Sequence, residues 1–122
     1  MTERTLTTAH RPHPSGAVVL TVAGELDHHT APELTQAIQE TSFAPGTSVI
    51  IDLTGLTYCD STGITVLITA HDRARQAQSL LILTGLNKDL LRVFHIMGLD
   101  QIFTFQPTVD DAVSALRPST EH

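Results

Sequence analysis

Hydrophobic and polar positions along the chain switch repeatedly between a period of two residues and a period of three to four residues. Three short runs rich in β-branched residues are apolar on both faces, which is typical of interior strands: residues 17–24, 48–53 and 80–85. Two weaker strand candidates lie at 102–105 and within 1–11. Apolar residues that recur at i, i+3 and i+4 predict helices at about 31–41, 61–78, 88–97 and 109–116.

Strands that alternate with helices of this length predict βαβ units with right-handed crossovers. The predicted fold class is therefore α/β, a mostly parallel sheet of four to five strands with about four helices, in which the first strand could run antiparallel. The 122 residues correspond to about one domain. We expect an N-terminal segment with a Pro-rich loop over residues 1–16, the domain itself over 17–117, and a short tail over 118–122.

Helix termini have recognisable signals in this sequence. Thr30-Ala-Pro-Glu33 fits a capping box with proline in the first turn, and Asp60 and Asn87 are placed to cap the next two helices. The third helix repeats its apolar residues at i, i+3, i+4 and i+7, which predicts that all four face the core: Leu90, Val93, Phe94 and Met97.

Composition and charge limit the classes of function that the chain could have. The chain is 41% hydrophobic, but it has no uninterrupted apolar run of the roughly 18 residues that a membrane span needs, so we expect a soluble protein. Seven scattered basic residues against thirteen acidic ones give a formal charge of −6, which argues against nucleic acid as a partner. The single Cys59 and the absence of an apolar secretory signal favour a cytoplasmic location.

Two polar segments follow predicted strands and are candidate interaction sites. The first runs from Gly24 to Glu33, and the second from Tyr58 to Ile64. We expect both to be loops at the carboxyl ends of parallel strands, where ligands and partners usually meet an open α/β sheet. Ser61 should be exposed there, because Gly63 in the first turn of the helix removes a side chain beside it. Local chemistry alone also fits a simple helix start.

Catalytic and metal-binding interpretations find little support. The Gly-x-Ser-x-Gly elbow of a serine hydrolase is missing around Ser61, and no pair of histidines has zinc-ligand spacing. Phosphate-binding glycine motifs are also missing, so we predict no cofactor and no metal. Cys59 has no basic neighbour in sequence and fits a small buried hydrophobe. A small enzyme or ligand site using His28, Asp60 and Ser61 stays as an alternative of a different class.

The two candidate segments together resemble one protein family. Gly24-Glu-Leu-Asp-His-His-Thr-Ala31 is similar to the stretch GELDHHTA of sporulation antagonists, and Asp60-Ser-Thr-Gly-Ile64 is similar to a phosphorylation site, Asp-Ser-[Ser/Thr]-Gly-[Leu/Ile]. Both belong to the STAS-domain anti-sigma factor antagonists of the SpoIIAA and RsbV type. The likeness extends in order and spacing from about Val18 to Leu116. The first strand and the Pro-rich loop at 12–14 have no clear match.

This resemblance implies a binding module without catalysis that regulates transcription in stress response or sporulation. The unmodified chain would bind an anti-sigma factor with a histidine-kinase-like ATPase fold and thereby free a sigma factor. The partner would phosphorylate Ser61, which would block binding, and a PP2C-type phosphatase would reset the switch. The residues matched to the docking surface are Glu25, Asp27, His28, Asp60, Ser61, Thr62 and Gly63.

Two alternatives accompany the family assignment. Thr62 in the third motif position is a second hydroxyl that a kinase could use. A STAS interaction module of another signalling or transporter-associated complex, without a sigma factor, is the runner-up function. A phosphate at Ser61 would add about −1.5 to −2 charges beside Asp60, on a face that already contains Glu25 and Asp27.

Overall fold

The computed structural model describes residues 4–116, so the predicted tail at 118–122 and the first three residues lie outside the described part. The strands are β1 (Leu6–Pro12), β2 (Val18–Leu26), β3 (Ser48–Cys59), β4 (Leu80–Thr84) and β5 (Thr104–Gln106). The helices are α1 (Ala31–Gln39), α2 (Ser61–Gln76), α3 (Lys88–Ile96) and α4 (Val109–Leu116), and a single 3-10 turn covers Leu99–Gln101. The α/β class and the helix pattern are thus confirmed.

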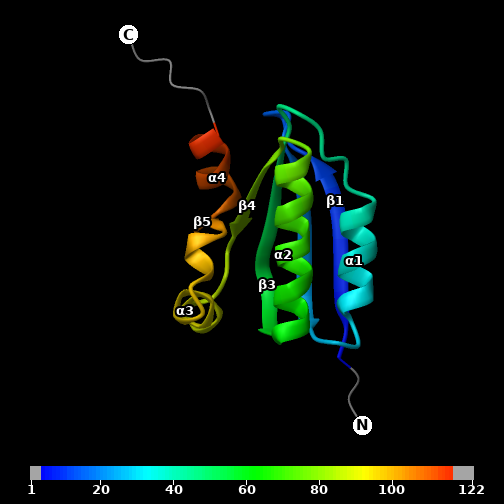
Figure 1. Ribbon diagram of the computed structural model, residues 1–122, viewed down its shortest axis with the longest axis vertical. Coiled ribbons are helices and arrows are strands. Elements are labelled where there is room, and N and C mark those ends of the chain that lie inside the picture. Colours follow the sequence, from blue (N-terminus) through cyan, green and yellow to red (C-terminus); the bar gives the residue numbers. More distant parts are fainter. Residues whose placement is uncertain (1–3, 117–122) are drawn as a thin grey trace.

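The five strands form one sheet in the order of the sequence, β1-β2-β3-β4-β5. β1 runs antiparallel to β2, whereas β2 to β5 are parallel. As Figure 1 shows, α1 and α2 lie side by side over one face of the sheet, with α2 along β3 and α1 along β1. α4 packs on the opposite face, where Ala112 and Val113 meet Val19, Ile50 and Ile82. Helices therefore cover both faces of the parallel part of the sheet, as is usual for parallel sheets.

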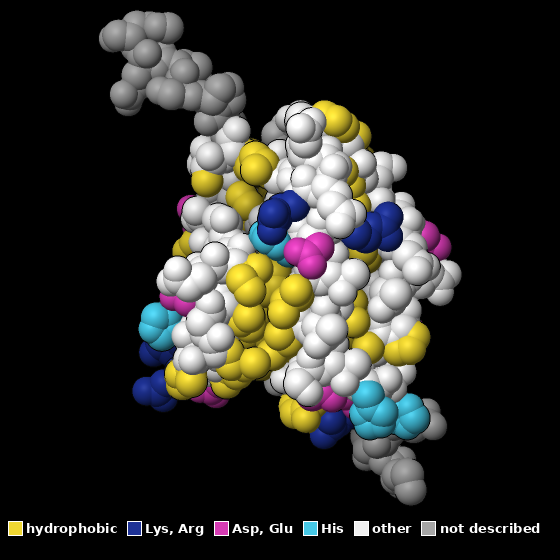
Figure 2. Space-filling view, in the orientation of Figure 1, with side chains coloured by type: hydrophobic (Ala, Val, Ile, Leu, Met, Phe, Trp, Pro, Cys, Tyr) yellow, Lys and Arg dark blue, Asp and Glu magenta, His cyan; other side chains and the backbone are white. Residues whose placement is uncertain are grey.

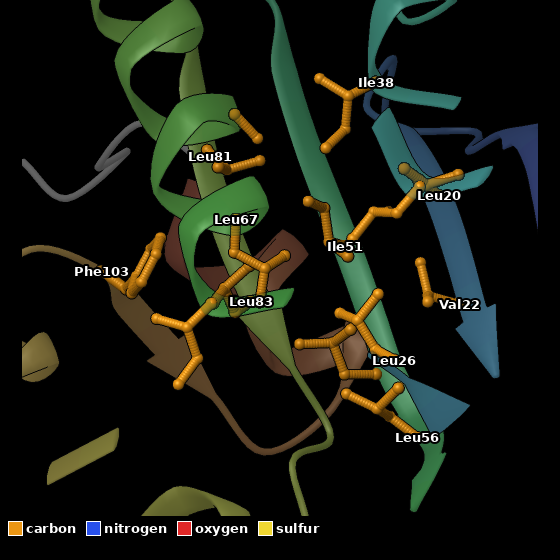
Figure 3. Close-up of a cluster of buried hydrophobic side chains, with 14 of the residues drawn as sticks. Leu20, Val22, Leu26, Ile38, Ile51, Leu56, Leu67, Leu81, Leu83 and Phe103 are labelled. Carbon is orange, nitrogen blue, oxygen red and sulfur yellow. The ribbon is translucent and has the colours of Figure 1, made fainter. Parts of the chain in front are cut away.

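The main core lies between the sheet and the layer of α1 and α2. Ile51 of β3, Leu67 of α2 and Leu83 of β4 are completely buried in it. Figure 3 shows Leu67 pointing from α2 onto the sheet toward the other two. Leu26 and Leu56, at the carboxyl ends of β2 and β3, belong to the same cluster. The core therefore reaches the strand ends from which the candidate segments start.

The weakly predicted first strand exists. β1 pairs with β2 over its whole length, from Leu6 opposite Gly24 to Pro12 opposite Val18, and it buries Leu6 against the core. Gly24 itself has a φ of +110°, and a Cβ there would collide with the backbone carbonyl of Thr5. Glycine is thus needed at this position for both conformation and space.

Two strands are longer than the sequence pattern predicts. β2 does not end at Gly24 but continues, after a register shift, to Leu26, and β3 does not end at Leu53 but runs to Cys59. The extensions pair with each other, so that Leu26 lies opposite Cys59. Pairing between the two strands therefore keeps extended what looks locally like loop, and both candidate segments are shorter than predicted.

Two expectations about helices are wrong. Thr30 precedes α1 but makes no side-chain capping bond to it; its hydroxyl instead donates to the Glu25 carbonyl, at 2.8 Å. In α3 only Phe94 is fully buried, whereas Val93 and the C-capping residue Met97 are exposed, at 43% and 52%. α3 lies beside the end of the sheet, so only a narrow stripe of it meets the core. By contrast, Asp60 and Asn87 cap α2 and α3 as predicted.

Truncation of Leu67 should show how strongly α2 is held against the sheet. Because this side chain is fully buried, Leu67→Ala is expected to lower the free energy of unfolding by about 2–5 kcal/mol, through lost burial and a residual cavity. Urea unfolding followed by circular dichroism measures the difference. Thr69→Ala, on the exposed side of the same helix, is the control and should change it by less than about 0.5 kcal/mol. Equal effects would contradict this packing.

Candidate functional site

The two candidate segments meet at the carboxyl ends of β2 and β3. The backbone N–H of Asp60 donates to the carbonyl of Leu26 at 3.0 Å, which joins the points where the two strands end. Residues 27–30 then lead into α1, and Asp60 leads directly into α2. In Figure 2, acidic, basic and histidine side chains gather at the lower end of the molecule, where α1 and α2 begin. Segments more than thirty residues apart in sequence thus form one surface.

Asp60 connects the two segments through both of its carboxylate oxygens. Oδ1 accepts the backbone N–H of Gly63 at 3.0 Å, which caps α2. Oδ2 accepts the backbone N–H of His28 at 3.2 Å. One carboxylate therefore fixes the start of α2 and the loop before α1 relative to each other, and the negative charge is favourable at a helix N-terminus.

Ser61 and Thr62 begin α2 and are both exposed. The Ser61 carbonyl accepts the Thr65 hydroxyl at 2.9 Å. The Ser61 hydroxyl itself has no hydrogen-bond partner among residues 4–116. This side chain is therefore free to react or to contact another molecule.

Gly63 is buried, which changes the reason for its presence. A Cβ at this position would lie 2.5 Å from Cγ of Leu26 and 3.0 Å from the sulfur of Cys59. The glycine thus allows the first turn of α2 to approach the ends of β2 and β3, rather than clearing space beside Ser61 for a partner. Gly63 therefore sets the position of the first turn of α2 without contributing a side chain to the surface.

Asp27 is also buried, with 4% of its surface exposed, and its carboxylate organises the loop. Oδ1 accepts the backbone N–H groups of His29 at 2.9 Å and of Thr30 at 3.0 Å, and Oδ2 accepts from Arg4 at 3.3 Å. Desolvation by itself raises the pKa of Asp27, but these hydrogen bonds outweigh it and hold the pKa below its ordinary value. The ionised carboxylate is therefore the form that the loop stabilises.

Glu25 and His28 complete the set of sequence-predicted residues. A Glu25 carboxylate oxygen lies 3.8 Å from Nε of Arg4, and the exposed rings of His28 and His29 stack with centroids 5.1 Å apart. All seven predicted residues thus lie around the joined strand ends. Glu25 and His28 contribute side chains to the surface, as do Ser61 and Thr62, whereas Asp27 and Gly63 support it from within.

Some of the surface was missed by sequence reasoning. Arg4 places its guanidinium 4.1 Å from the centre of the Tyr58 ring, beside Asp27. A shallow groove of about 690 Å³ also extends from the loop, between the two helices; its lining includes His28, Pro32, Thr35, Gln36, Thr62 and Val66. Helical periodicity predicts exposed positions on α1 and α2, but it does not predict how the helices pair, so the groove had no signal in the sequence.

Nothing in the described part of the chain adds catalytic groups to this surface. Desolvation, followed by the charge of Asp60, raises the pKa of the Cys59 thiol to about 12, which makes it a poor nucleophile. Across residues 4–116, no three His, Cys, Asp or Glu side chains are grouped so that they could hold a metal ion. In the same residues, no helix is long and apolar enough to cross a membrane.

Comparison with known proteins gives one consistent result. A family model described as "STAS domain" matches residues 8–112. An anti-sigma-B factor antagonist of Listeria monocytogenes is 44% identical over 81 residues, which cover 66% of this chain and 71% of that protein.

Two solved structures extend this result. The crystal structure of an anti-sigma factor antagonist from Mycobacterium paratuberculosis has a TM-score of 0.82 at 31% identity and covers 93% of this chain and 96% of that one. The phosphorylated form of SpoIIAA from Bacillus has a TM-score of 0.65 at 21% identity and covers 91% and 100% of the respective chains; this likeness concerns the fold alone.

Neutralising Asp27 should reveal its contribution through pH. Because its folded-state pKa is lowered, the carboxylate stabilises the fold at pH values above the ordinary 3.8, and that stabilisation is lost as the pH falls through the folded-state pKa. Asp27→Asn should therefore melt at a lower temperature than the parent protein at pH 7, and the difference should shrink at strongly acidic pH. Calorimetry across this range tests the expectation, which a pH-independent difference would contradict.

The thiol of Cys59 should react slowly in the folded protein. With a pKa of about 12, roughly one thiol in ten thousand is ionised at pH 8, and burial adds a steric barrier. Modification by a disulfide reagent such as Ellman's should be at least about 100-fold faster in urea than in buffer. Similar rates in the two solvents would show that the thiol is accessible and acidic.

Proposed function

The chain belongs to the STAS-domain family of anti-sigma factor antagonists, and we propose that phosphorylation of Ser61 controls its binding to an anti-sigma factor. In its unphosphorylated form the chain binds an anti-sigma factor that is also a serine kinase, and a sigma factor is released. Phosphorylated chain does not bind. Anti-sigma factor antagonists are non-enzymatic STAS proteins, so the chain acts by binding and not by catalysis.

The observation that carries this proposal is the exposed Ser61 hydroxyl at the start of α2, next to the capping carboxylate of Asp60. A kinase can reach this hydroxyl without unfolding the chain. The surrounding backbone is held by Asp60 and Asp27, so the surface around the hydroxyl keeps its shape in the absence of a partner. A preorganised surface loses little conformational entropy on binding.

Electrostatics explains how a phosphate would block binding. The dianion would lie beside the carboxylate of Asp60, so the partner would have to desolvate these neighbouring negative charges together. Leaving one such charge buried and unpaired costs about 3–5 kcal/mol. Since about 1.4 kcal/mol corresponds to a tenfold change, affinity would fall by roughly two to four orders of magnitude.

The phosphate itself can be tolerated by the antagonist. It would lie at the N-terminus of α2, where backbone N–H groups and the helix dipole favour an anion. We therefore expect the fold to change little on phosphorylation. The effect of the modification is on the partner and not on the stability of the chain.

The remaining components of the proposal follow from the same family. The anti-sigma factor has a histidine-kinase-like ATPase fold, a PP2C-type phosphatase removes the phosphate, and the exchange takes place in the cytoplasm. Such a switch would serve stress response or sporulation. The Listeria relative is an anti-sigma-B factor antagonist, which supports an anti-sigma factor as the partner of this chain.

Binding by Ser61 variants tests the proposal directly. Ser61→Ala and Ser61→Asp are used as baits in lysate of the source cells with ATP. Ser61→Ala is expected to retain an anti-sigma factor of the kinase fold, and Ser61→Asp to lose it, because the carboxylate adds a charge where the partner docks. Calorimetric titration of the purified pair should then give an affinity difference of about 100-fold or more.

Two controls make the result specific. Ser114→Asp adds the same charge on an exposed position of α4, on the other face of the sheet, and should bind normally. Thr62→Ala should still be phosphorylated by the partner, as detected by mass spectrometry, whereas Ser61→Ala should not. Equal retention of the anti-sigma factor by Ser61→Ala and Ser61→Asp would remove the charge mechanism.

A further inference from the structure

The N-terminal segment outside the family motifs lies directly against the docking surface. The backbone N–H of Glu25 donates to the carbonyl of Thr5 at 2.9 Å, just before β1 begins at Leu6. Gly24 packs on the same carbonyl so closely that no side chain would fit. These contacts place the chain at Thr5 beside the end of β2, and the preceding residue enters the same region.

That preceding residue, Arg4, contacts three groups of the site at once. Its NH1 group donates to Oδ2 of Asp27 at 3.3 Å, its Nε lies 3.8 Å from a carboxylate oxygen of Glu25, and its guanidinium carbon lies 4.1 Å from the centre of the Tyr58 ring. The Arg4 side chain is 43% exposed, whereas that of Asp27 is 6% exposed. The guanidinium thus covers the Asp27 carboxylate on the solvent side.

The Arg4 guanidinium supplies the positive charge that the Asp27 carboxylate needs. A nearly buried carboxylate is costly unless it is both hydrogen-bonded and paired with a positive charge. Backbone N–H groups of His29 and Thr30 supply the hydrogen bonds, and Arg4 supplies the charge. Tyr58 contributes an aromatic face that holds the planar guanidinium in place.

We propose that Arg4, seated on Tyr58, is a positioning residue of the docking surface: it holds Asp27, and through Asp27 the loop of residues 27–30, in the conformation that the partner binds. The inference rests on the proposed function for its docking part. The same loop delivers the His28 backbone to Asp60, so displacement of the loop also loosens the start of α2 beside Ser61. A residue far from both motifs thereby influences the switch.

Substitution of Arg4 tests the loop first, without any partner. In Arg4→Ala, hydrogen exchange of the His29 and Thr30 backbone amides, measured by NMR, should accelerate at least about tenfold, because Asp27 loses its counter-charge. The Asp27 carboxyl should titrate at higher pH, since one group that lowers its pKa is removed. Arg4→Lys keeps the positive charge but lacks the planar guanidinium. Its exchange rates and its Asp27 pKa should lie between those of the parent protein and those of Arg4→Ala.

Arg11→Ala, an exposed arginine near the other end of β1, is the matched control and should leave both measurements unchanged. Tyr58→Ala should reproduce part of the Arg4→Ala effect, because the guanidinium loses its support. Amides in the middle of β3 should exchange at parental rates in all variants. Faster exchange there would assign the change to general destabilisation and would overturn a positioning role.

Affinity for the anti-sigma factor tests the docking part. The measurement uses the partner recovered with Ser61→Ala, and each arginine substitution is combined with Ser61→Ala. The Arg4→Ala combination should bind this partner about tenfold more weakly than Ser61→Ala alone. The Arg4→Lys combination should have an intermediate affinity, and the Arg11→Ala combination an unchanged one. Unchanged loop exchange in Arg4→Ala overturns the proposal, as does faster exchange with undiminished affinity. If Ser61→Ala itself recovers no anti-sigma factor, the proposed function fails, and the exchange and titration data still decide whether Arg4 positions the loop.

Discussion

The hydrogen bond between the Asp60 amide and the Leu26 carbonyl is the constraint on which the rest of the site depends. It joins the carboxyl ends of the neighbouring parallel strands β2 and β3, so the polar segments that follow these strands form one surface. The Asp60 carboxylate extends the connection to the His28 amide on one side and the Gly63 amide on the other. Ser61 is exposed because it is the next residue after this junction, at the first position of α2.

Much of the fold could be predicted because local periodicity reflects burial. The runs at 48–53 and 80–85 are apolar on both faces because helices cover β3 and β4, and Asp60 and Asn87 cap helices through bonds that span only three residues. The incorrect predictions have a common cause, which is pairing between residues far apart in the sequence. Residues 25–26 and 54–59 look like loop in isolation, yet residues 23–26 pair with positions between 55 and 59 in a parallel ladder. The Thr30 hydroxyl donates to the Glu25 carbonyl instead of capping α1.

In the candidate site, too, some features could be predicted from local sequence and others depend on tertiary contacts. The helix cap at Asp60 and the exposure of Ser61 could be predicted from the local sequence, whereas the burial of Asp27 and Gly63 against the strand ends could not. Arg4 and Tyr58 are 54 positions apart by their numbering, and nothing near either residue indicates the other. The carboxylates of Asp27 and Asp60 hold the backbone through hydrogen bonds, whereas the exposed Ser61 hydroxyl makes none within residues 4–116. Rigidity of the support and freedom of the hydroxyl are what a surface controlled by one modification requires.

The partly buried sulfur of Cys59 has a consequence for the reactivity of this residue. Cysteine reacts with peroxide as the thiolate, and Cys59 is held almost entirely as the thiol by desolvation and by the neighbouring Asp60. A Cβ at Gly63 would lie 3.0 Å from this sulfur, so the thiol packs beneath the first turn of α2. Low ionisation therefore makes the Cys59 thiol a slow target for oxidants compared with a thiol of ordinary pKa.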